Sequence, residues 1–135
     1  MIDAHSALRS HLIATSALRT LLGGDYVYWP EIPGTVTMPR KAISFRFSGG
    51  QSNPYLYAQQ ARVVFRCYGS TAIEAMSVYR ALYDRLHLSQ NFIVSTVGFY
   101  GAMEDVPGDP QEDPDTDWPF VHTVYTLWVA TVAVA

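Results

Sequence analysis

The sequence predicts an α+β domain with a mainly antiparallel sheet and two helices packed on one face of it. Two segments repeat apolar residues at helical spacing, and several others alternate apolar and polar residues as strands do. One stretch, residues 61–88, changes from the strand pattern to the helical pattern without a linker. The expected order is helix, short strand, two strands, helix, two strands. A chain of 135 residues is long enough for one such domain, spanning residues 1–135.

The first helix is expected over residues 3–22. Asp3 is a suitable N-cap, and Gly23 and Gly24 end the helical pattern. The apolar stripe between these signals consists of Ala4, Leu8, Leu12, Leu18 and Leu22. A short strand is expected over residues 26–29, and the proline-containing segment 30–39 is expected to be an irregular connection.

Two strands follow, joined by a segment rich in turn residues. Residues 41–47 and 58–68 both alternate apolar and polar side chains, which is the strand period. Residues 48–57 lie between them and contain Gly-Gly and Asn-Pro pairs, which are typical of turns. We interpret this segment as a long flexible loop or as the tip of a long hairpin.

The second of these strands passes directly into the second helix. Gly69 and Ser70 end the strand alternation. Thr71 followed by Glu74 is a capping-box signature, because each side chain can bond a backbone N–H of the other's turn. Apolar residues then recur at helical spacing, so the helix is expected over residues 71–88.

The last two strands are expected over residues 92–99 and 120–132. Because residues 120–132 carry large apolar groups on both faces, we expect that strand in the centre of the sheet. Residues 100–119 hold seven of the chain's twelve acids and four of its eight prolines. A loop of that length is uncommon inside a compact domain, so we interpret it as a functional loop.

Charge and composition exclude several classes of protein. The formal net charge is −3 and Lys41 is the only lysine, so the chain lacks the clustered cations that bind phosphates. No apolar run approaches the roughly 20 residues of a membrane-spanning helix, and the N-terminus shows no export signal. We therefore expect no membrane partner. Cys67 is the only cysteine, which excludes an intrachain disulfide, and its apolar surroundings predict a buried thiol in a reducing compartment.

The candidate site is an interface between proteins. One predicted sheet face carries Arg46, Arg62 and Arg66, and it is either a solvated surface or a contact surface. The acidic loop supplies the opposite charge. Its candidate contact residues are Glu104, Asp105, Asp109, Glu112, Asp113, Asp115 and Asp117. If the loop extends away from its own sheet, it can reach the arginines of the next copy in a head-to-tail contact.

Other interpretations have less support. A divalent cation could bind the acidic loop, but the loop lacks the glycine and the final glutamate of an EF-hand. The four histidines show no zinc-ligand spacing. A triad of Cys67, His122 and an aspartate is conceivable, yet no nucleophile motif surrounds it. We expect no enzyme activity, no metal and no cofactor. The alternative function is a small ligand- or metal-binding module that uses the acidic loop.

Four segments together resemble a known family. They are LRTLLGGDYVYWPEIPG at the end of the first helix, MPRKAISFRF, RVVFRCYGSTAIEAMSVYRALYDRL, and DPDTDWPFVHTVYTLWV before the C-terminus. In order and spacing they resemble the small tail terminator, or tail completion, proteins of long-tailed bacteriophages. The resemblance covers nearly the whole chain, although each segment alone is a structural pattern without specific chemistry.

The resemblance implies a virion structural protein that forms a ring, commonly a hexamer. Such a ring caps the head-proximal end of the tail tube, stops its polymerisation and provides the surface that joins the head or neck. The implied partners are further copies of the chain, the tail tube protein and a head-completion or neck protein, while DNA only passes through the channel. The implied location is the virion, after assembly in the host cytoplasm. Another head–tail joining protein, such as a head-closure or connector subunit, fits the same pattern.

Overall fold

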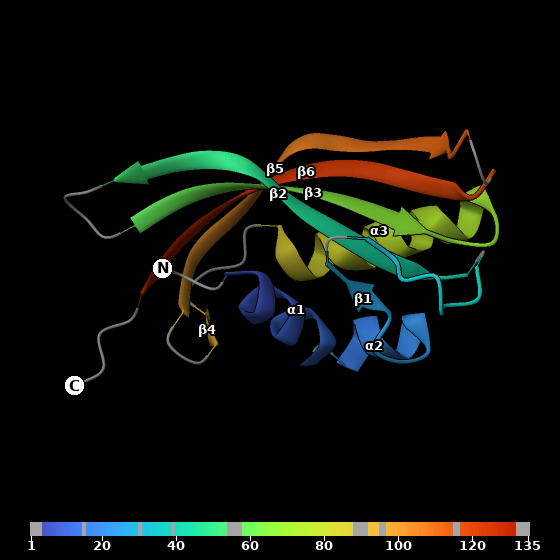
Figure 1. Ribbon diagram of the computed structural model, residues 1–135, viewed down its shortest axis with the longest axis horizontal. Helices are drawn as coiled ribbons and strands as arrows, with labels where there is room; N and C mark the ends of the chain where they lie inside the picture. Colours follow the sequence, from blue (N-terminus) through green and yellow to red (C-terminus); the bar gives the residue numbers. More distant parts are fainter. Residues whose placement is uncertain are drawn as a thin grey trace.

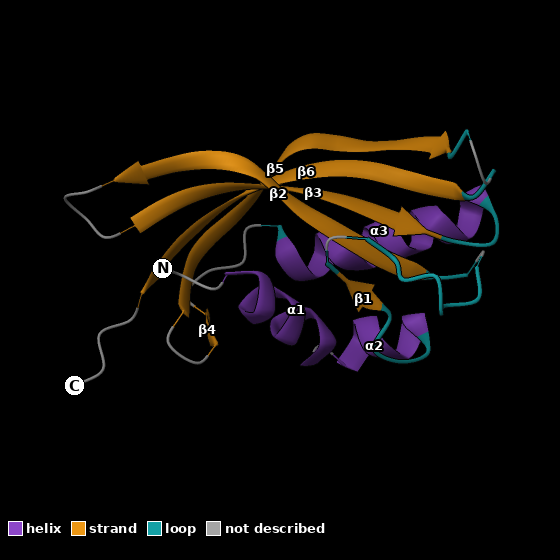
Figure 2. Cartoon of the chain, in the orientation of Figure 1, coloured by secondary structure: helices purple, strands orange, loops and turns teal. Residues whose placement is uncertain are grey.

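In the computed structural model, helices cover one face of a curled sheet (Figure 1, Figure 2). The structure describes residues 4–14, 16–29, 31–38, 40–53, 58–87, 92–94, 97–114 and 117–131. The helices within them are α1 (Ala4–Ala14), α2 (Ser16–Leu22) and α3 (Ala72–Leu86). The strands are β1 (Val27–Tyr28), β2 (Ala42–Asn53), β3 (Ala58–Tyr68), β4 (Phe92–Val94), β5 (Val97–Glu112) and β6 (Pro119–Thr131). The α+β class expected from the sequence is confirmed.

The strands described lie in the order β1-β2-β3-β6-β5-β4. β1 pairs parallel with β2, and the other neighbouring pairs are antiparallel, so the sheet is mainly antiparallel as predicted. β6 lies between β3 and β5, which confirms the central position inferred from its two apolar faces. This order sets the β2–β3 hairpin beside the β5–β6 hairpin.

The core lies between the sheet and the helices. Alternate side chains of β2, β3 and β6 point toward the helices, because successive residues of a strand face opposite sides. Phe45, Phe65 and Tyr125 form a row across these strands, with ring centroids 5.8 Å apart for the first pair and 5.5 Å for the second. The helices cover this row with fully buried leucines, among them Leu8, Leu12, Leu18, Leu22, Leu82 and Leu86.

The junction from β3 to α3 has the predicted capping geometry. The Thr71 hydroxyl accepts the N–H of Glu74 at 3.3 Å, and the Glu74 carboxylate accepts the N–H of Ser70 at 2.7 Å. Gly69 is required here by close packing, since a Cβ at this position would lie 2.4 Å from the backbone nitrogen of Ala75. The helix that was expected over residues 71–88 spans Ala72–Leu86.

The helix expected over residues 3–22 is instead two helices, α1 and α2, so the sheet is covered by three helices within the described residues and not by two. Position 15, between the two helices, lies outside the described residues. Among the helices described, none is both long and apolar enough to span a membrane.

The prediction of a long loop over residues 100–119 is wrong for most of that range. Strand β5 continues to Glu112 and pairs with β6, which leaves a short turn after it. Beyond Phe99, β5 has no second neighbour among the described strands, so this part is a sheet edge. Edge strands tolerate Pro107 and Pro110 and are often rich in charge, because both features discourage pairing with another chain. The composition that suggested a loop is therefore that of a protected edge strand.

The segment expected as a loop over residues 48–57 is also mostly strand. β2 continues to Asn53 and β3 begins at Ala58, so the long-hairpin alternative is correct and the loop alternative is not. Residues 54–57 lie outside the described residues. The register shifts between Phe47 and Gly50, where the Ser-Gly pair forms a bulge. The hairpin extends past the helical layer (Figure 1).

Candidate interface on the outer face of the sheet

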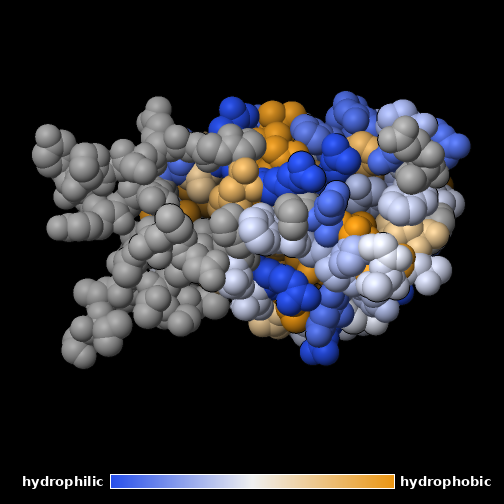
Figure 3. Space-filling view, in the orientation of Figure 1, coloured by the Kyte–Doolittle hydropathy of each residue, from blue (hydrophilic) through white to orange (hydrophobic). Residues whose placement is uncertain are grey.

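The face of the sheet opposite the helices is the candidate site, and we call it the outer face. The strand register assigns its side chains. They are Ser44, Arg46, Arg62, Val64, Arg66 and Tyr68 from β2 and β3, Phe120, His122, Val124, Thr126 and Trp128 from β6, and Met103, Val106, Asp109 and Gln111 from β5. Asp105, at the bulge between Glu104 and Val106, lies on the same face because it accepts the Thr126 hydroxyl. Hydrophilic and hydrophobic residues alternate over the surface seen in Figure 3. Three large apolar side chains of the outer face are exposed, Trp128 by 36%, Val106 by 37% and Met103 by 43%.

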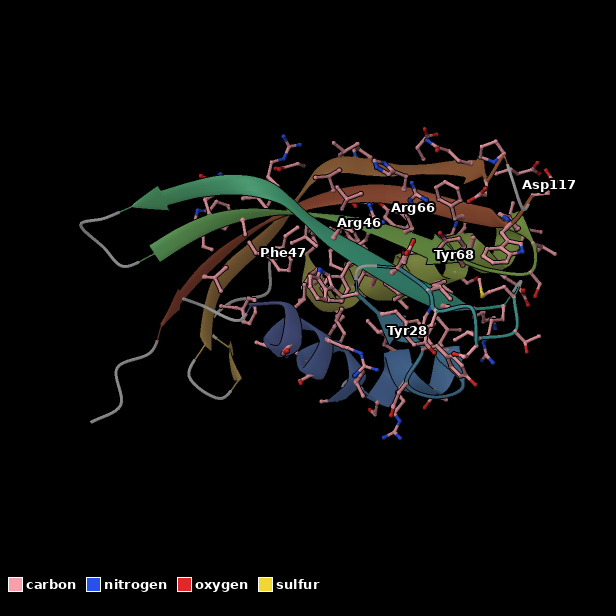
Figure 4. All side chains as sticks on the ribbon, in the orientation of Figure 1. Tyr28, Arg46, Phe47, Arg66, Tyr68 and Asp117 are labelled. Atoms are coloured by element: carbon pink, nitrogen blue, oxygen red, sulfur yellow. The ribbon has the colours of Figure 1, made fainter. Side chains whose placement is uncertain are left out.

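A hollow of about 490 Å³ opens on this face beside the β5–β6 turn. Its lining comes from β2, β3, the segment after β1 and the turn, and includes Glu31, Ile32, Ser44, Arg46, Val64, Arg66, Tyr68, Asp113 and Trp118. The Tyr68 ring packs edge-on against Trp118 at 6.2 Å and is tilted against Phe120 at 5.6 Å. Figure 4 shows Arg46 and Arg66 on neighbouring strands, with Tyr68 closer to the turn that holds Asp117.

The three predicted arginines all lie on the outer face, but their surroundings differ. Arg46 pairs with Glu31 at 3.6 Å, and Arg62 pairs with Asp105 at 3.9 Å. These exposed pairs contribute little stability, on the order of 0–1 kcal/mol each. The Arg66 guanidinium lies 5.0 Å from the centroid of the Phe120 ring, and no carboxylate within the described residues is in ion-pair range of it. Among the described residues, Arg66 is therefore the arginine of this face without a carboxylate partner.

The predicted acids follow β5 and its turn and do not form a projecting arm. Asp105 accepts the Thr126 hydroxyl, and Asp109 accepts the Gln111 amide at 3.1 Å, both on the outer face. Glu112 is exposed at the end of β5. Asp113 and Asp117 close the turn, where the Asp117 N–H donates to the Asp113 carbonyl at 2.8 Å and Asp117 has φ 58°. Asp115 lies outside the described residues.

Since the acids belong to the same sheet as the arginines, the premise of a loop extending toward a neighbour is wrong. The Arg62–Asp105 pair shows the consequence, because it joins β3 to β5 across β6 within one chain. A contact between copies must therefore use charges that this intramolecular pairing leaves open.

Glu104 lies apart from the other predicted acids, on the helix side of the sheet. Its carboxylate accepts the hydroxyl of Tyr79 at 2.6 Å, of Thr123 at 3.3 Å and of Tyr125 at 3.4 Å. Burial, followed by the hydrogen bond to Glu104, raises the pKa of Tyr79. Burial also raises the pKa of Tyr125. The Glu104 N–H donates to His87 Nδ1 at 3.2 Å, so this residue ties α3 to β5 and β6.

Sequence reasoning missed a row of residues that crosses the outer face. Ser44 pairs with Arg66, Arg66 pairs with His122, and His122 pairs with Asp109, on β2, β3, β6 and β5 in turn. The alternation around Arg66 and His122 showed that each faces away from the core side chains. The register between strands that are far apart in the chain decides which residues become neighbours. A local sequence pattern cannot predict that register.

The geometry separates the groups of the conceivable catalytic triad. Cys67 pairs with Val121 on the helix side, whereas His122 lies on the outer face, so the sheet stands between them. Burial raises the pKa of the Cys67 thiol, and a buried thiol of this kind is unreactive. Within the part of the chain that the structure describes, no three His, Cys, Asp or Glu side chains are placed to share a metal ion.

Comparison with known proteins gives an informative similarity in fold. The fold matches a chain from the virion of a native gene transfer agent particle with a TM-score of 0.69. The match covers 96% of this chain and 98% of that chain at 17% sequence identity, so the two share the fold over nearly their full lengths. No protein-family model and no curated protein matches the sequence.

Proposed function

We propose that this chain is a structural subunit of a phage-like virion. The observation that carries the proposal is the shared fold, over nearly the full length of both chains, with a chain of a gene transfer agent particle. The outer face supports a role in protein contacts, because interface cores are enriched in aromatic residues, Met and Arg, and Trp128, Met103 and Arg66 lie there. This role locates the protein in the particle and needs no catalysis, metal or cofactor.

Within the particle, we propose that the chain is the tail terminator. The four sequence segments described above support it. In this role, copies of the chain form a ring, commonly a hexamer, on the head-proximal end of the tail tube, where they stop tube growth and bind a head-completion or neck protein. DNA passes through the ring without being held, which suits a chain of net charge −3 because like charges repel phosphates. Assembly takes place in the host cytoplasm.

The outer face is the surface that we propose for these contacts. Its charged groups are Arg46, Arg62, Arg66, Asp105 and Asp109, with Glu112, Asp113 and Asp117 at the end of β5 and in its turn. The sequence assigns Asp115 to the same turn. Glu104 is left out of the proposed surface because it is bound on the helix side.

Deletion of the gene in the particle-producing strain tests the role. Loss of a terminator gives tail tubes of irregular and excessive length without heads, and the purified protein added to extracts restores joined particles. Loss of another head–tail joining protein leaves free tails of normal length, which would favour that alternative. Mass spectrometry of purified particles tests the broader proposal, since absence of the protein from complete particles contradicts it.

A further inference from the structure

The outer face carries charges of opposite sign on opposite sides of β6. Arg62 and Arg66 lie on β3, whereas Asp105 and Asp109 lie on β5, with β6 between the two strands. Adjacent strands are about 4.8 Å apart, so the two rows of charge are separated by about 10 Å. A face of this kind is complementary to another copy of itself when the arginine row of one copy meets the aspartate row of the other.

Among the described residues of the two rows, Arg66 and Asp109 are the charges that form no ion pair. Arg62 and Asp105 neutralise each other within the chain. Arg66 and Asp109 do not, because His122 separates them in the row across the sheet. Within the described residues, Asp109 accepts the Gln111 amide and Arg66 contacts the Phe120 ring, and neither has a charged partner.

Two hydroxyl groups in the lining of the hollow beside Arg66 have no hydrogen-bond partner among the described residues. Ser44 and Tyr68 line it and are only 5% and 6% exposed, and neither hydroxyl makes a hydrogen bond within the described residues. Arg46 and Arg66 also line it, and Arg46 is already paired with Glu31. Hydroxyl and guanidinium donors around one space are what a carboxylate requires, since an ionised carboxylate accepts on both oxygens.

We infer that this hollow binds the Asp109 carboxylate of a second copy of the chain. The inference rests on the proposed role as an assembling subunit and names the contact that such a subunit would use. Asp109 suits the hollow because it is exposed and lies after a bulge in an edge strand, where the backbone is open to a neighbour. The exposed side chains of Trp128 and Met103 lie on the same face and add apolar contact area.

The acids of the hollow favour a single carboxylate over a polyanion. Glu31 and Asp113 line the same space, so closely spaced phosphates would be repelled. The neighbours of Asp109 in the chain are Gly108 and Pro110, which carry no charge. A segment with one negative charge and neutral flanks therefore meets less repulsion from Glu31 and Asp113 than a polyanion would.

Charge reversal and mixing test the contact. Arg66→Glu and Asp109→Arg are each expected to weaken self-association of the full chain at least about tenfold, measured by sedimentation velocity over a range of concentrations at low salt. An equal mixture of the two variants is expected to associate like the wild type. In the mixture, the two reversed charges face each other, and the unchanged Arg66 of one variant faces the unchanged Asp109 of the other.

Matched controls separate this contact from general charge effects. Arg80→Glu and Asp84→Arg make the same charge changes at exposed positions on α3, on the other side of the sheet, and should leave association unchanged. The neutral variants Arg66→Gln and Asp109→Asn should each weaken association, and their mixture should recover only part of it, because only the unchanged Arg66 and Asp109 pair with each other.

Two results would overturn the inference. The first is a mixture of the charge-reversed variants that stays dissociated while the control variants associate. The second is a wild-type chain that stays monomeric at every concentration, which excludes the contact between copies. Neither result bears on the virion assignment, because that proposal fails only if the protein is missing from purified particles.

Discussion

The contact between Gly108 and Tyr79 offers a quantitative test of how α3 is held on the sheet. The Gly108 N–H donates to the Tyr79 hydroxyl at 3.1 Å, and the same hydroxyl donates to Glu104 at 2.6 Å. A Cβ at position 108 would lie 2.6, 2.7 and 2.8 Å from three atoms of the Tyr79 ring. Gly108→Ala must therefore displace the ring and lengthen both hydrogen bonds.

The expected loss follows from these two bonds. A hydrogen bond to a charged group contributes about 1.5–3 kcal/mol and a neutral one about 0.5–1.5 kcal/mol, and we take the lower values because Tyr79 is only half-buried. Replacing glycine with alanine also stabilises the folded state by about 0.5 kcal/mol, because it lowers the conformational entropy of the unfolded chain. The net loss in the free energy of unfolding is about 1.5 kcal/mol. Dividing this loss by the entropy of unfolding expected for 135 residues gives a Tm that is lower by about 5 °C.

A double-mutant cycle measures whether displacement of the Tyr79 ring causes the loss of stability in Gly108→Ala. Denaturant unfolding would compare the wild type, Gly108→Ala, Tyr79→Ala and the double variant. When position 79 is alanine there is no ring to displace, so Gly108→Ala should then have little effect, with a coupling free energy of about 1 kcal/mol or more. An equal loss from Gly108→Ala in both backgrounds would refute the reasoning.

Three further predictions concern stability, measured by denaturant unfolding. Burial lowers the pKa of His11 to about 4, so the unfolded chain binds a proton more readily between pH 6.5 and pH 4. Stability should therefore fall by about 2 kcal/mol from pH 7 to pH 5, and His11→Asn should flatten that profile. Thr71→Ala removes the N-cap oxygen of α3 and should lower the free energy of unfolding by about 1 kcal/mol, while Thr71→Ser should retain it. Gly69→Ala brings a Cβ against the backbone of Ala75, which no side-chain rotation can relieve, so its loss should exceed that of Gly108→Ala. Its control, Gly34→Ala, meets no atom within 4 Å and should change stability by less than about 0.5 kcal/mol; a loss as large as that of Gly69→Ala would contradict the steric argument.

The elements that sequence reasoning predicted well depend on near neighbours in the chain. The β3–α3 unit is the clearest case, because the strand alternation, the Thr71 cap and the helical apolar spacing all act within a few residues. The central place of β6 was also predictable, since large apolar groups on both faces of a strand favour a position inside the sheet, although helices cover only one face of β6 (Figure 1).

The error at β5 has a physical cause. Prolines and acids discourage strand pairing, and a sheet edge uses them for that reason just as a loop does. In the sequence, a loop and an edge strand therefore look alike. They differ only in whether a neighbouring strand forms backbone hydrogen bonds with one side of the segment. In this protein β6 does so, from positions after the turn.

The sequence by itself determined the fold class, the central strand and the placing of three arginines on one face of the sheet. These follow from the period of each element and from short-range capping. Only the tertiary structure decided which charges meet. It paired Arg62 with Asp105, turned Glu104 toward α3 and left Arg66 beside an open hollow. Those outcomes depend on register and bulges between strands distant in the chain, where a shift of one residue would move every side chain to the other face.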